Sequence, residues 1–404
     1  MKPAVLTPDA ARARILAALA DLAPLPAERV PLAGALGRVL AEDLAAAHDL
    51  PGFDVSTMDG YALRAADAVA PGTRLPVAFE VFAGRAPGPL APGACCRIFT
   101  GAPLPDGADC VEMQEQVRRR GRAAVFARPA VAGRFLRRRG SDLAAGAVAL
   151  RAGAVLDPGT IGLAAALGRA DLAVHRRPRV AILPTGDEVV PLGRTPGPGQ
   201  IVESNGHALG AAVRDAGGDP ALLPIARDEE EALARGIAAA RGFDVLVTTG
   251  GVSVGAKDLV RAALGRAGAR LDFWRVAMRP GKPFTFGRWG EAAVFGLPGN
   301  PASALVTFEL FVRPALRALA GFAGPSRPTV EARLGAAQEK PPELTVFLRC
   351  RVRAARGGLV AEPLRTQASG DLTSAAGHDA LAVLPAGRSR LARGAPVTLL
   401  LLRP

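Results

Sequence analysis

Apolar residues recur at helical spacing near the start of the chain and again after its first third. Thr7-Pro8-Asp9 combines an N-cap residue, a proline at the first helical position and an acid, and Ile15 and Leu19 follow on one helical face. Asp157-Pro158-Gly159 shows the same signals and begins a helix that runs to Gly168. We expect these two helices to pack against each other.

Between the two predicted helices the chain changes to short apolar stretches separated by glycine and proline. This punctuation is typical of strands joined by tight turns. The clearest stretches are 75–82, 95–99, 110–113 and 124–127. The sequence therefore predicts a β-rich inserted domain over residues 46–145, which interrupts a helical linking domain made of residues 1–45 and 146–176.

From residue 177 onward, strands, loops and helices follow one another in repetition. Val180–Leu183 and Val245–Thr249 are apolar runs typical of buried strands, and each is followed by a loop that contains glycine. This alternation predicts a multidomain α/β protein whose central domain, residues 177–327, is a parallel sheet between two helical layers. Helices are predicted at three places in it: over 205–213, after Asp228 with capping-box spacing, and after Asn300-Pro301.

Strict alternation of apolar and mostly basic residues marks the last part of the chain. Val346, Leu348 and Cys350 alternate with Arg349 and Arg351, which is typical of a strand with one buried face and one solvated basic face. Gly357-Gly358 then supplies a hairpin turn. Residues 328–404 are therefore predicted to form a small β-barrel-like domain.

The composition places the chain among globular proteins with several domains. Its 404 residues suffice for two to four domains, and 49% apolar with 22% charged residues exclude a disordered chain. No apolar run approaches the roughly 18 residues of a membrane span, so we expect a soluble cytoplasmic protein without a membrane partner. Four cysteines without a CxxC pair and four histidines argue against a disulfide framework and a structural zinc site.

The net charge of +13 suggests nucleic-acid binding, but the residues behind it do not support that function. Only four of the 50 basic residues are lysine, a skew typical of coding bias. The runs 118–120 and 137–139 lack the interleaved aromatic residues that stack on bases. We therefore expect no nucleic-acid partner. Rare residue types gain weight against this background, among them Lys257, Lys282, Asn205, Asn300 and Tyr61.

A glycine-rich loop follows the predicted strand at 245–249. Gly250 and Gly251 let backbone N–H groups approach a phosphate, and the helix that follows adds its partial positive charge. Lys257 falls one residue late for a Walker A loop, and no GxGxxG follows a strand, so neither a P-loop NTPase nor an NAD enzyme is supported. A glycine turn used only for tight packing remains the alternative.

Two further loops carry chemistry that suits anions. Arg279-Pro280-Gly281-Lys282-Pro283 fixes two cations on a loop stiffened by prolines, which suits a compact oxyanion, although a surface turn with solvated cations remains possible on the sequence alone. Residues 296–303, Gly-Leu-Pro-Gly-Asn-Pro-Ala-Ser, lead from a strand into a helix and offer free N–H groups. Helix capping explains Asn300 as well as ligand binding does.

Carboxylates accompany these loops. Glu188, Asp228 and Asp258 each follow or flank a predicted strand end, where acids can share a divalent metal with substrate phosphates. Each of them is explained equally well as a helix cap. In the β-rich domain Asp59, Thr100 and Asp142 lie on predicted turns, and their chemistry stays open on these grounds alone.

Nine motifs, in this order, closely resemble the MoeA family of molybdopterin molybdenumtransferases, which is related to the E domain of gephyrin. They span nearly the whole chain. Two positions depart from the family pattern, since Ala256 stands where an acid is common and Arg279 where a lysine is frequent. The motifs are Pro51-Gly52-Phe53-Asp54 with Ser56, Met58-Asp59-Gly60-Tyr61-Ala62, Phe99-Thr100-Gly101-Ala102, Gly107-Ala108-Asp109, Pro184-Thr185-Gly186-Asp187-Glu188, Ser204-Asn205, Thr248–Gly255, Arg279–Pro283 and Gly296–Ser303.

The resemblance implies an elongated homodimer that inserts molybdenum from molybdate into adenylylated molybdopterin with Mg²⁺ and releases AMP. It implies that the adenylyl and pyrophosphate groups are bound by Thr249, Gly250, Gly251 and Ser253, with Pro298 and Asn300 in the neighbouring loop. It implies a metal site of Glu188, Asp228 and Asp258, and a molybdate site of Arg279, Lys282 and Ser303. The implied catalytic residues are Asp59, Thr100 and Asp142, contributed by the other subunit, together with Glu188 and Lys282.

Two other functions remain open at this stage. The α/β domain also resembles that of the enzymes that adenylylate molybdopterin, but those enzymes consist of little more than this one domain. A non-catalytic scaffold that binds molybdopterin or nucleic acid through its basic surface is the second alternative. Salt-dependent binding without turnover would favour the scaffold.

Overall fold

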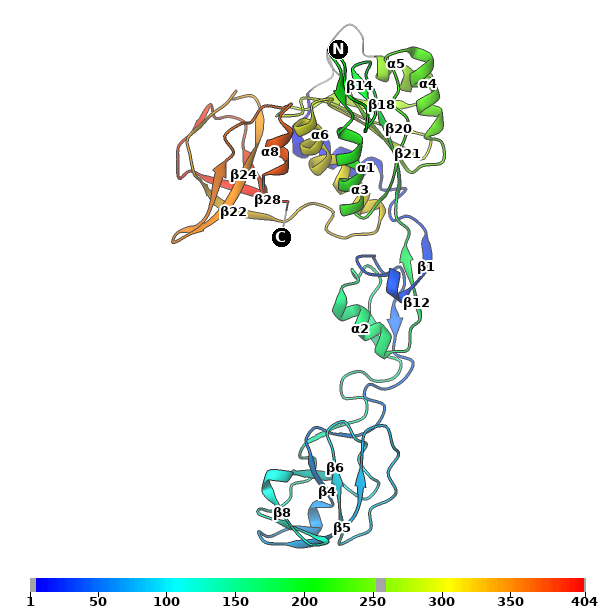
Figure 1. The fold of residues 1–404 in the computed structure, drawn as a ribbon, viewed down its shortest axis with the longest axis vertical. Helices are drawn as coiled ribbons and strands as arrows, with labels where there is room; N and C mark the ends of the chain where they lie inside the picture. The colour runs from blue at the N-terminus through cyan, green and yellow to red at the C-terminus, as the bar shows by residue number, and fades with distance from the viewer. Residues whose placement is uncertain (1–4, 252–258, 403–404) are drawn as a thin grey trace. The chain divides into compact units, whose positions relative to one another are not determined.

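The computed structural model describes residues 5–251 and 259–402 (Figure 1). The chain divides into two units. Unit 1 comprises Met1–Val30, Gly37–Ala41 and Ala173–Pro404, and unit 2 comprises Pro31–Leu36 and Glu42–Leu172. Among the helices of the described residues, none combines the length and the apolar character needed to cross a bilayer.

A six-stranded mixed sheet forms the centre of unit 1, with the strand order β16-β13-β17-β21-β20-β18. Figure 1 labels β18, β20 and β21 of this sheet. The strand β20 runs antiparallel to both of its neighbours, whereas the other neighbouring pairs are parallel. The sequence predicted a parallel sheet. The difference arises because the turn at Gly290, between β20 and β21, is too short for the crossover that parallel strands need. The strands are β13 (Arg179–Pro184), β16 (Asp219–Leu222), β17 (Val245–Thr249), β18 (Arg270–Arg275), β20 (Pro283–Trp289) and β21 (Ala292–Leu297).

Helices cover both faces of this sheet, as the sequence predicted. Along β13 the side chains of Val180 and Ile182 join one apolar cluster, and those of Ala181 and Leu183 join another, because successive residues point to opposite faces. The first cluster includes side chains of α1, α3, α6, η4 and α7, and the second includes those of α4 and α5. The helices are α1 (Pro8–Ala18), α3 (Asn205–Asp215), α4 (Glu230–Ala239), α5 (Leu259–Arg266), α6 (Pro301–Thr307), the π-helical turn η4 (Phe308–Val312), and α7 (Arg313–Leu319).

The first helix does not pack where the sequence analysis placed it. Helix α1 belongs to unit 1, where Ile15 is buried in the same cluster as Leu316 of α7, whereas α2 (Pro158–Ala166) belongs to unit 2. The expectation that the two helices pack against each other is therefore wrong. Apolar spacing identifies the buried face of a helix, but it does not identify the partner that covers that face. The predicted domain boundaries themselves stay predictions.

The end of unit 1 is a closed β-barrel around its own apolar core. Five strands close in the order β24-β25-β22-β28-β26, with β26 pairing back to β24. The short strand β19 pairs in parallel with the first residues of β24. The hairpin turn predicted at Gly357-Gly358 joins β24 to β25. The strands are β19 (Met278–Arg279), β22 (Thr329–Leu334), β24 (Thr345–Ala355), β25 (Gly358–Pro363), β26 (Ala380–Leu384) and β28 (Pro396–Leu401), and the helix α8 (Leu372–Ala376) precedes β26.

One face of β24 differs from its predicted environment. Arg351 and Arg353 are exposed, as expected, but Phe347 and Arg349 on the same face are 5% and 1% exposed. Alternation in the sequence shows which residues share a face of a strand. It does not show that other parts of the chain cover one end of the outer face. Arg349 is therefore a buried residue, and the solvated basic face is shorter than predicted.

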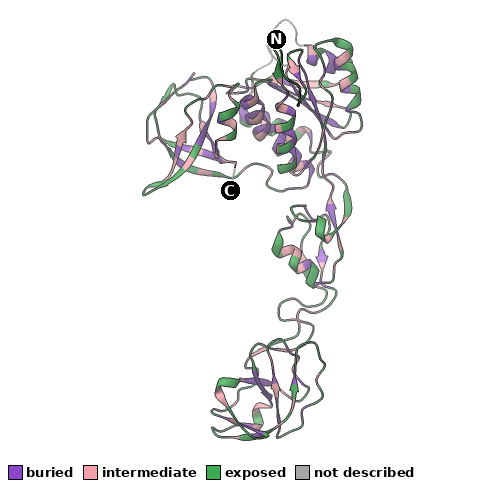
Figure 2. Ribbon diagram, in the orientation of Figure 1, coloured by how far each residue is buried: buried purple, intermediate pink, exposed green. Residues whose placement is uncertain are grey.

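Unit 2 contains a second six-stranded sheet, of order β7-β4-β6-β5-β9-β8. Buried residues lie along its strands (Figure 2). Apolar clusters lie on both of its faces, and each predicted strand of the β-rich domain is present within a few residues. The strands are β4 (Gly60–Leu63), β5 (Arg74–Val81), β6 (Cys95–Ile98), β7 (Cys110–Met113), β8 (Val117–Arg120) and β9 (Ala123–Phe126).

Short elements complete the fold. The two-stranded pairs are β1 (Ala27–Pro31) with β12 (Asp171–His175), β2 (Leu44–Ala45) with β11 (Val148–Leu150), β3 (Val55–Ser56) with β10 (Leu136–Arg137), β14 (Val189–Val190) with β15 (Ile201–Val202), and β23 (Gln338–Glu339) with β27 (Arg390–Leu391). The 3₁₀ turns are η1 (Leu32–Gly34), η2 (Ala65–Asp67) and η3 (Gln114–Gln116).

The four cysteines are buried and form no disulfide, as the sequence predicted. Burial raises the pKa of each thiol to about 12. The protonated thiols act as small apolar side chains in the cores that contain them.

Candidate functional site

Three strands of the central sheet end together at one edge. Pairing of Pro184 in β13 with Thr249 in β17, and of Thr249 with Leu297 in β21, aligns their carboxyl ends. The loops that follow these strands therefore emerge side by side, which is where ligands bind in open α/β sheets.

The basic turn at 279–283 lies at the same edge. Because β20 runs antiparallel to β21, its first residues lie beside the last residues of β21, with Thr285 opposite Gly296. Gly281 has φ +96°, and a Cβ atom there would collide with Thr307 of α6. The turn is thus packed against the helix that follows β21, at the edge of the sheet where the glycine loop after β17 also emerges.

Tight packing fixes the glycine loop after β17. Gly250 has φ +88°, and a Cβ atom on it would lie 2.7 Å from Thr185 O. Its N–H group donates to Leu297 O at 3.2 Å, so this N–H is not free to bind a phosphate. Gly251 has φ +63°, and a Cβ atom there would collide with Val260. Packing therefore explains Gly250, and any N–H cradle must begin at Gly251.

Two predicted ligands of this loop, Ser253 and Asp258, lie outside the described residues, as does Lys257. Thr249 is 3% exposed and contributes to a small cavity of about 40 Å³, which we call the loop cavity. The side chain of Thr248 is fully buried, and its Oγ1 has no hydrogen-bond partner. The loop cavity is lined by residues of several loops, namely Pro184, Thr185, Glu188, Val189, Val202, Glu203, Ser204, Asn205, Thr249, Gly250 and Gly299.

The two asparagines connect segments that are far apart in sequence. Asn205 Nδ2 donates to Gly299 O at 2.7 Å, and Asn300 Nδ2 donates to Ser369 Oγ at 3.0 Å. Asn300 occupies the N-cap position of α6, as predicted, but its side chain makes no capping hydrogen bond. The amide is used instead to hold the barrel segment around Ser369 against the loop after β21.

The predicted anion ligands have different environments. Arg279 and Lys282 are exposed on the basic turn, whereas Ser303 is 3% exposed in α6 and Pro298 is buried. Arg279 belongs to β19 and pairs with Val346 of the barrel. A cavity of about 100 Å³ lies beside it, lined in part by Pro280, Lys340, Gln367 and Leu384.

Arg349 is a candidate that the sequence analysis missed. Its amide N–H donates to Gln367 Oε1 and its Nη2 to Ala368 O, both at 3.0 Å, whereas Nε and Nη1 are buried without a hydrogen-bond partner. Burial lowers the pKa of this guanidinium, although Asp371 acts against it. In the sequence nothing separates Arg349 from its exposed neighbours on β24, because its burial comes from the segment at 367–371.

The carboxylates at this edge are spread over separate loops. Glu188 folds back over Gly186, where a Cβ atom would lie 2.5 Å from its Oε2, and it lines the loop cavity. Asp187 Oδ1 accepts a hydrogen bond from the N–H of Asp228 at 3.1 Å. Asp228 is not the N-cap of α4, which is Glu229 without a side-chain bond, so the predicted capping box is wrong. Within the described residues, no three Asp, Glu, His or Cys side chains group closely enough to hold a metal ion.

The three candidates of unit 2 fall into two groups. Asp59 Oδ1 accepts hydrogen bonds from the N–H and the Oγ1 of Thr100, both at 2.8 Å, and these bonds lower the pKa of Asp59. Asp142 accepts a hydrogen bond from Arg137 Nε at 2.9 Å. The structure thus brings Asp59 and Thr100 together, and it pairs Asp142 with an arginine.

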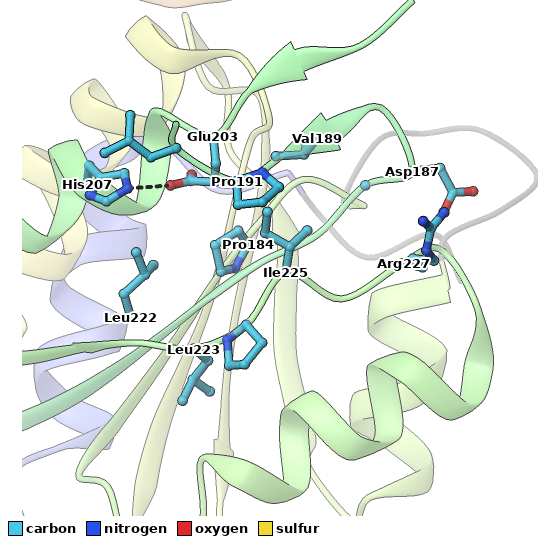
Figure 3. A pocket seen from close by; sticks show the side chains of 13 residues that line it. Pro184, Asp187, Val189, Pro191, Glu203, His207, Leu222, Leu223, Ile225 and Arg227 are labelled. Atoms are coloured by element: carbon cyan, nitrogen blue, oxygen red, sulfur yellow. Dashed lines mark ion pairs between the residues drawn. The ribbon is translucent and has the colours of Figure 1, made fainter. Parts of the chain in front are cut away.

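A large cavity of about 550 Å³, which we call the apolar cavity, lies beside the ends of β13 and β16 (Figure 3). Its walls are mostly proline, leucine and isoleucine side chains, and Glu203 Oε2 and His207 Nε2 lie 3.8 Å apart in it, a distance at which they pair when the imidazole is protonated. The sequence analysis did not single out these two residues, although Glu203 directly precedes the Ser204-Asn205 motif. The apolar cavity shares Pro184, Val189 and Glu203 with the loop cavity.

Comparison with protein families covers almost the whole chain. Residues 6–168 match the MoeA N-terminal region (domain I and II), residues 181–318 match a probable molybdopterin binding domain, and residues 331–402 match the MoeA C-terminal region (domain IV).

Individual relatives agree with this result. A molybdopterin molybdenumtransferase of Synechococcus elongatus is 39% identical over 97% of this chain and 98% of its own, and one of Bacillus subtilis is 36% identical over 93% and 90%. A crystal structure of the molybdopterin biosynthesis MoeA protein from Pyrococcus horikosii covers 99% of this chain and 100% of its own, with 32% identity and a TM-score of 0.84. The chain therefore belongs to the MoeA family, the transferases of molybdenum cofactor biosynthesis.

Proposed function

We propose that this protein inserts molybdenum from molybdate into the dithiolene of adenylylated molybdopterin, uses Mg²⁺, and releases AMP. One observation carries the proposal: the loops after β13, β17 and β21 and the basic turn before β20 meet at one edge of the sheet. The reaction joins a substrate that carries phosphates with a small oxyanion, so the two must bind in neighbouring sites. This edge supplies glycine-containing loops for the phosphates and a basic turn for the oxyanion.

Molybdate is assigned to the basic residues around β19. Arg279 and Lys282 are exposed to an incoming anion, and the buried Arg349 has two N–H donors without acceptors. Gln367 links the two environments, because it lines the cavity beside Arg279 and accepts from the amide of Arg349. A tetrahedral dianion would satisfy such donors through charge-assisted hydrogen bonds. Ser303, in α6 against the same turn, is assigned to this site as well.

The adenylyl and pyrophosphate groups are assigned to the loop cavity. Thr249 lines this cavity, and Gly251 follows it in the β17 loop, with Ser253 as a further predicted ligand. Pro298 and Asn300 lie in the loop after β21. Gly250 contributes through close packing, since its N–H is already bonded to Leu297 O.

Mg²⁺ is assigned to Glu188, with Asp228 and Asp258 as further candidates. The spread of these carboxylates fits Mg²⁺, which keeps several waters and is bound by one or two carboxylates together with substrate phosphates. When bound, Mg²⁺ would neutralise charge on the phosphoanhydride that is cleaved.

Asp59 and Thr100 form a hydrogen-bonded pair in unit 2, and Asp142 lies in the same unit. We propose that these residues complete the site of a second copy of the chain, so that the active protein is a homodimer. Mixing Asp59→Ala protein with Lys282→Ala protein tests this. If each site takes residues from both subunits, mixed dimers regain one intact site and insertion activity returns. Two inactive proteins that stay inactive after subunit exchange would contradict the proposal.

Substitution of Lys282 tests the molybdate site. One charge-assisted contact to a desolvated anion contributes roughly 1.5–3 kcal/mol, so Lys282→Ala should slow insertion about 10- to 100-fold at limiting molybdate. Arg356→Ala, which removes an exposed cation from the β24–β25 turn, is the matched control. Insertion by Lys282→Ala at the wild-type rate at limiting molybdate would refute the assignment.

A further inference from the structure

The apolar cavity contains one buried carboxylate oxygen that accepts no hydrogen bond. Glu203 is 5% exposed, and its Oε1 accepts from the N–H of Gly206 at 2.6 Å. Its Oε2 is buried without a hydrogen-bond partner, and His207 Nε2 lies 3.8 Å away (Figure 3). A buried acceptor left unsatisfied costs free energy, so this atom is suited to accept a hydrogen bond from a ligand.

The position of this carboxylate is fixed by its surroundings. Gly206, in the first turn of α3, leaves room for it, because a Cβ atom at 206 would collide with Leu222 and lie 3.1 Å from Glu203 Oε2. His207 follows on the same helix and is half-exposed at the cavity. Glu203 and His207 therefore present an acceptor and a nitrogen to the same space.

The cavity has the size and lining of a site for a flat heterocycle. Its volume of about 550 Å³ falls within the range of about 300–1,000 Å³ that is usual for small-molecule sites. Pro184, Pro191 and Ile225 provide apolar walls that can cover the faces of a ring (Figure 3). The two cavities share Pro184, Val189 and Glu203 as lining residues, so a ring bound here lies next to the loop cavity in which we place the phosphates.

Adenylylated molybdopterin carries two ring systems, and only one of them matches this acceptor. The pterin edge presents a carbonyl oxygen, a ring N–H and an amino group in a row, and the last two can donate side by side to a carboxylate. Adenine presents its amino group beside an unprotonated ring nitrogen, whose lone pair would face the carboxylate. Guanine shares the pterin pattern.

We infer that the apolar cavity binds the pterin half of the substrate and that Glu203 recognises its N–H and amino groups, with His207 facing the carbonyl oxygen. This assignment rests on the proposed function for the identity of the substrate. It leaves the adenylyl group to the loop cavity and the loop after β21.

Binding of free 6-hydroxymethylpterin, followed by its fluorescence, tests the inference in the full-length protein. Glu203→Gln keeps an oxygen for Gly206 N–H but loses the charge and one acceptor, so pterin affinity should fall about 10- to 100-fold while AMP affinity, measured by calorimetry, is unchanged. Glu231→Gln is the matched control, because its side chain is 90% exposed on α4, outside the cavity lining. His207→Leu is a second variant at an exposed position, for which a several-fold loss of pterin affinity is expected.

Several results would overturn the inference. Unchanged pterin affinity in Glu203→Gln, or a loss of AMP affinity with pterin binding intact, would show that the cavity does not select the pterin. Stronger competition with the pterin by GMP than by AMP would support recognition of the ring N–H and amino group by Glu203. Equal competition by the two nucleotides would contradict it. Failure of the wild-type protein to insert molybdenum, with Glu203-dependent pterin binding intact, would refute the proposed function and leave this site standing.

Discussion

Replacing Arg349 by methionine separates binding of an anion from stability of the fold. Each buried N–H without an acceptor costs about 1–3 kcal/mol, and Nε and Nη1 of Arg349 are two such groups. Methionine removes both costs and fills a similar volume. Against this gain stand the lost hydrogen bond to Ala368 O, about 1 kcal/mol, the unsatisfied oxygen it leaves, and the lost attraction to Asp371.

The sum predicts that Arg349→Met leaves the free energy of unfolding unchanged or raises it by up to about 3 kcal/mol. Loss of a buried side chain that makes only favourable contacts would instead lower it by about 2–5 kcal/mol. If Arg349 binds molybdate, the same variant should need about 10- to 100-fold more molybdate for half-maximal insertion, because a charge-assisted contact is lost.

The assay combines chemical denaturation with a molybdate titration of the insertion rate. Arg351→Met is the matched control on the same strand, since Arg351 is exposed, and it should change neither quantity appreciably. A clear loss of stability together with wild-type dependence on molybdate would refute the reasoning, because Arg349 would then serve the fold alone.

Two further predictions follow from the backbone of the basic turn and from a buried ion pair. Gly281→Ala should destabilise the protein by about 1–3 kcal/mol and weaken molybdate use, because the new Cβ collides with Thr307. Gly290→Ala is the control: its φ is also positive but the space around it is open, so it should cost less stability and leave activity unchanged. Equal effects of the two variants in denaturation and insertion assays would contradict this. Burial raises the pKa of Asp244, but hydrogen bonds from Arg176 and from the N–H of Arg179 outweigh burial and lower it. Asp244→Asn should therefore reduce stability at pH 7. The difference in stability from wild type should shrink as the pH falls below about 4, where the carboxylate protonates in the unfolded chain. Denaturation curves that show the same difference at pH 7 and below about pH 4 would contradict the stabilising role of the Asp244 carboxylate.

The strands and helices of unit 1 were predictable because the apolar residues that mark them in the sequence are also the residues that the fold buries. The runs at 180–183 and 245–249 are apolar throughout, and a strand buried on both faces needs that composition. The direction of β20 was not predictable from this pattern, because it depends on the length of the turn at Gly290.

The loops of the candidate site were predictable as loops, but their internal bonding was not. Glycine at 250 signals a close backbone approach, yet only the structure shows that its N–H donates to Leu297 O. Likewise, Asn300 could be placed at a helix start, but its bond to Ser369 depends on a segment almost 70 residues further on. Arg349 and Glu203 were missed for the same reason, since long-range contacts, not neighbouring residues, bury them.

The central claim is that the phosphates of the substrate and the molybdate bind next to each other at one edge of the sheet. Anomalous diffraction at the molybdenum edge, from crystals soaked with molybdate, AMP and Mg²⁺, measures this directly. We predict a molybdenum peak within hydrogen-bonding reach of Arg279, Lys282 or Arg349, and the AMP phosphate beside Gly251. A molybdenum site away from these cations, or AMP at the opposite edge of the sheet near Asp244, would contradict the account.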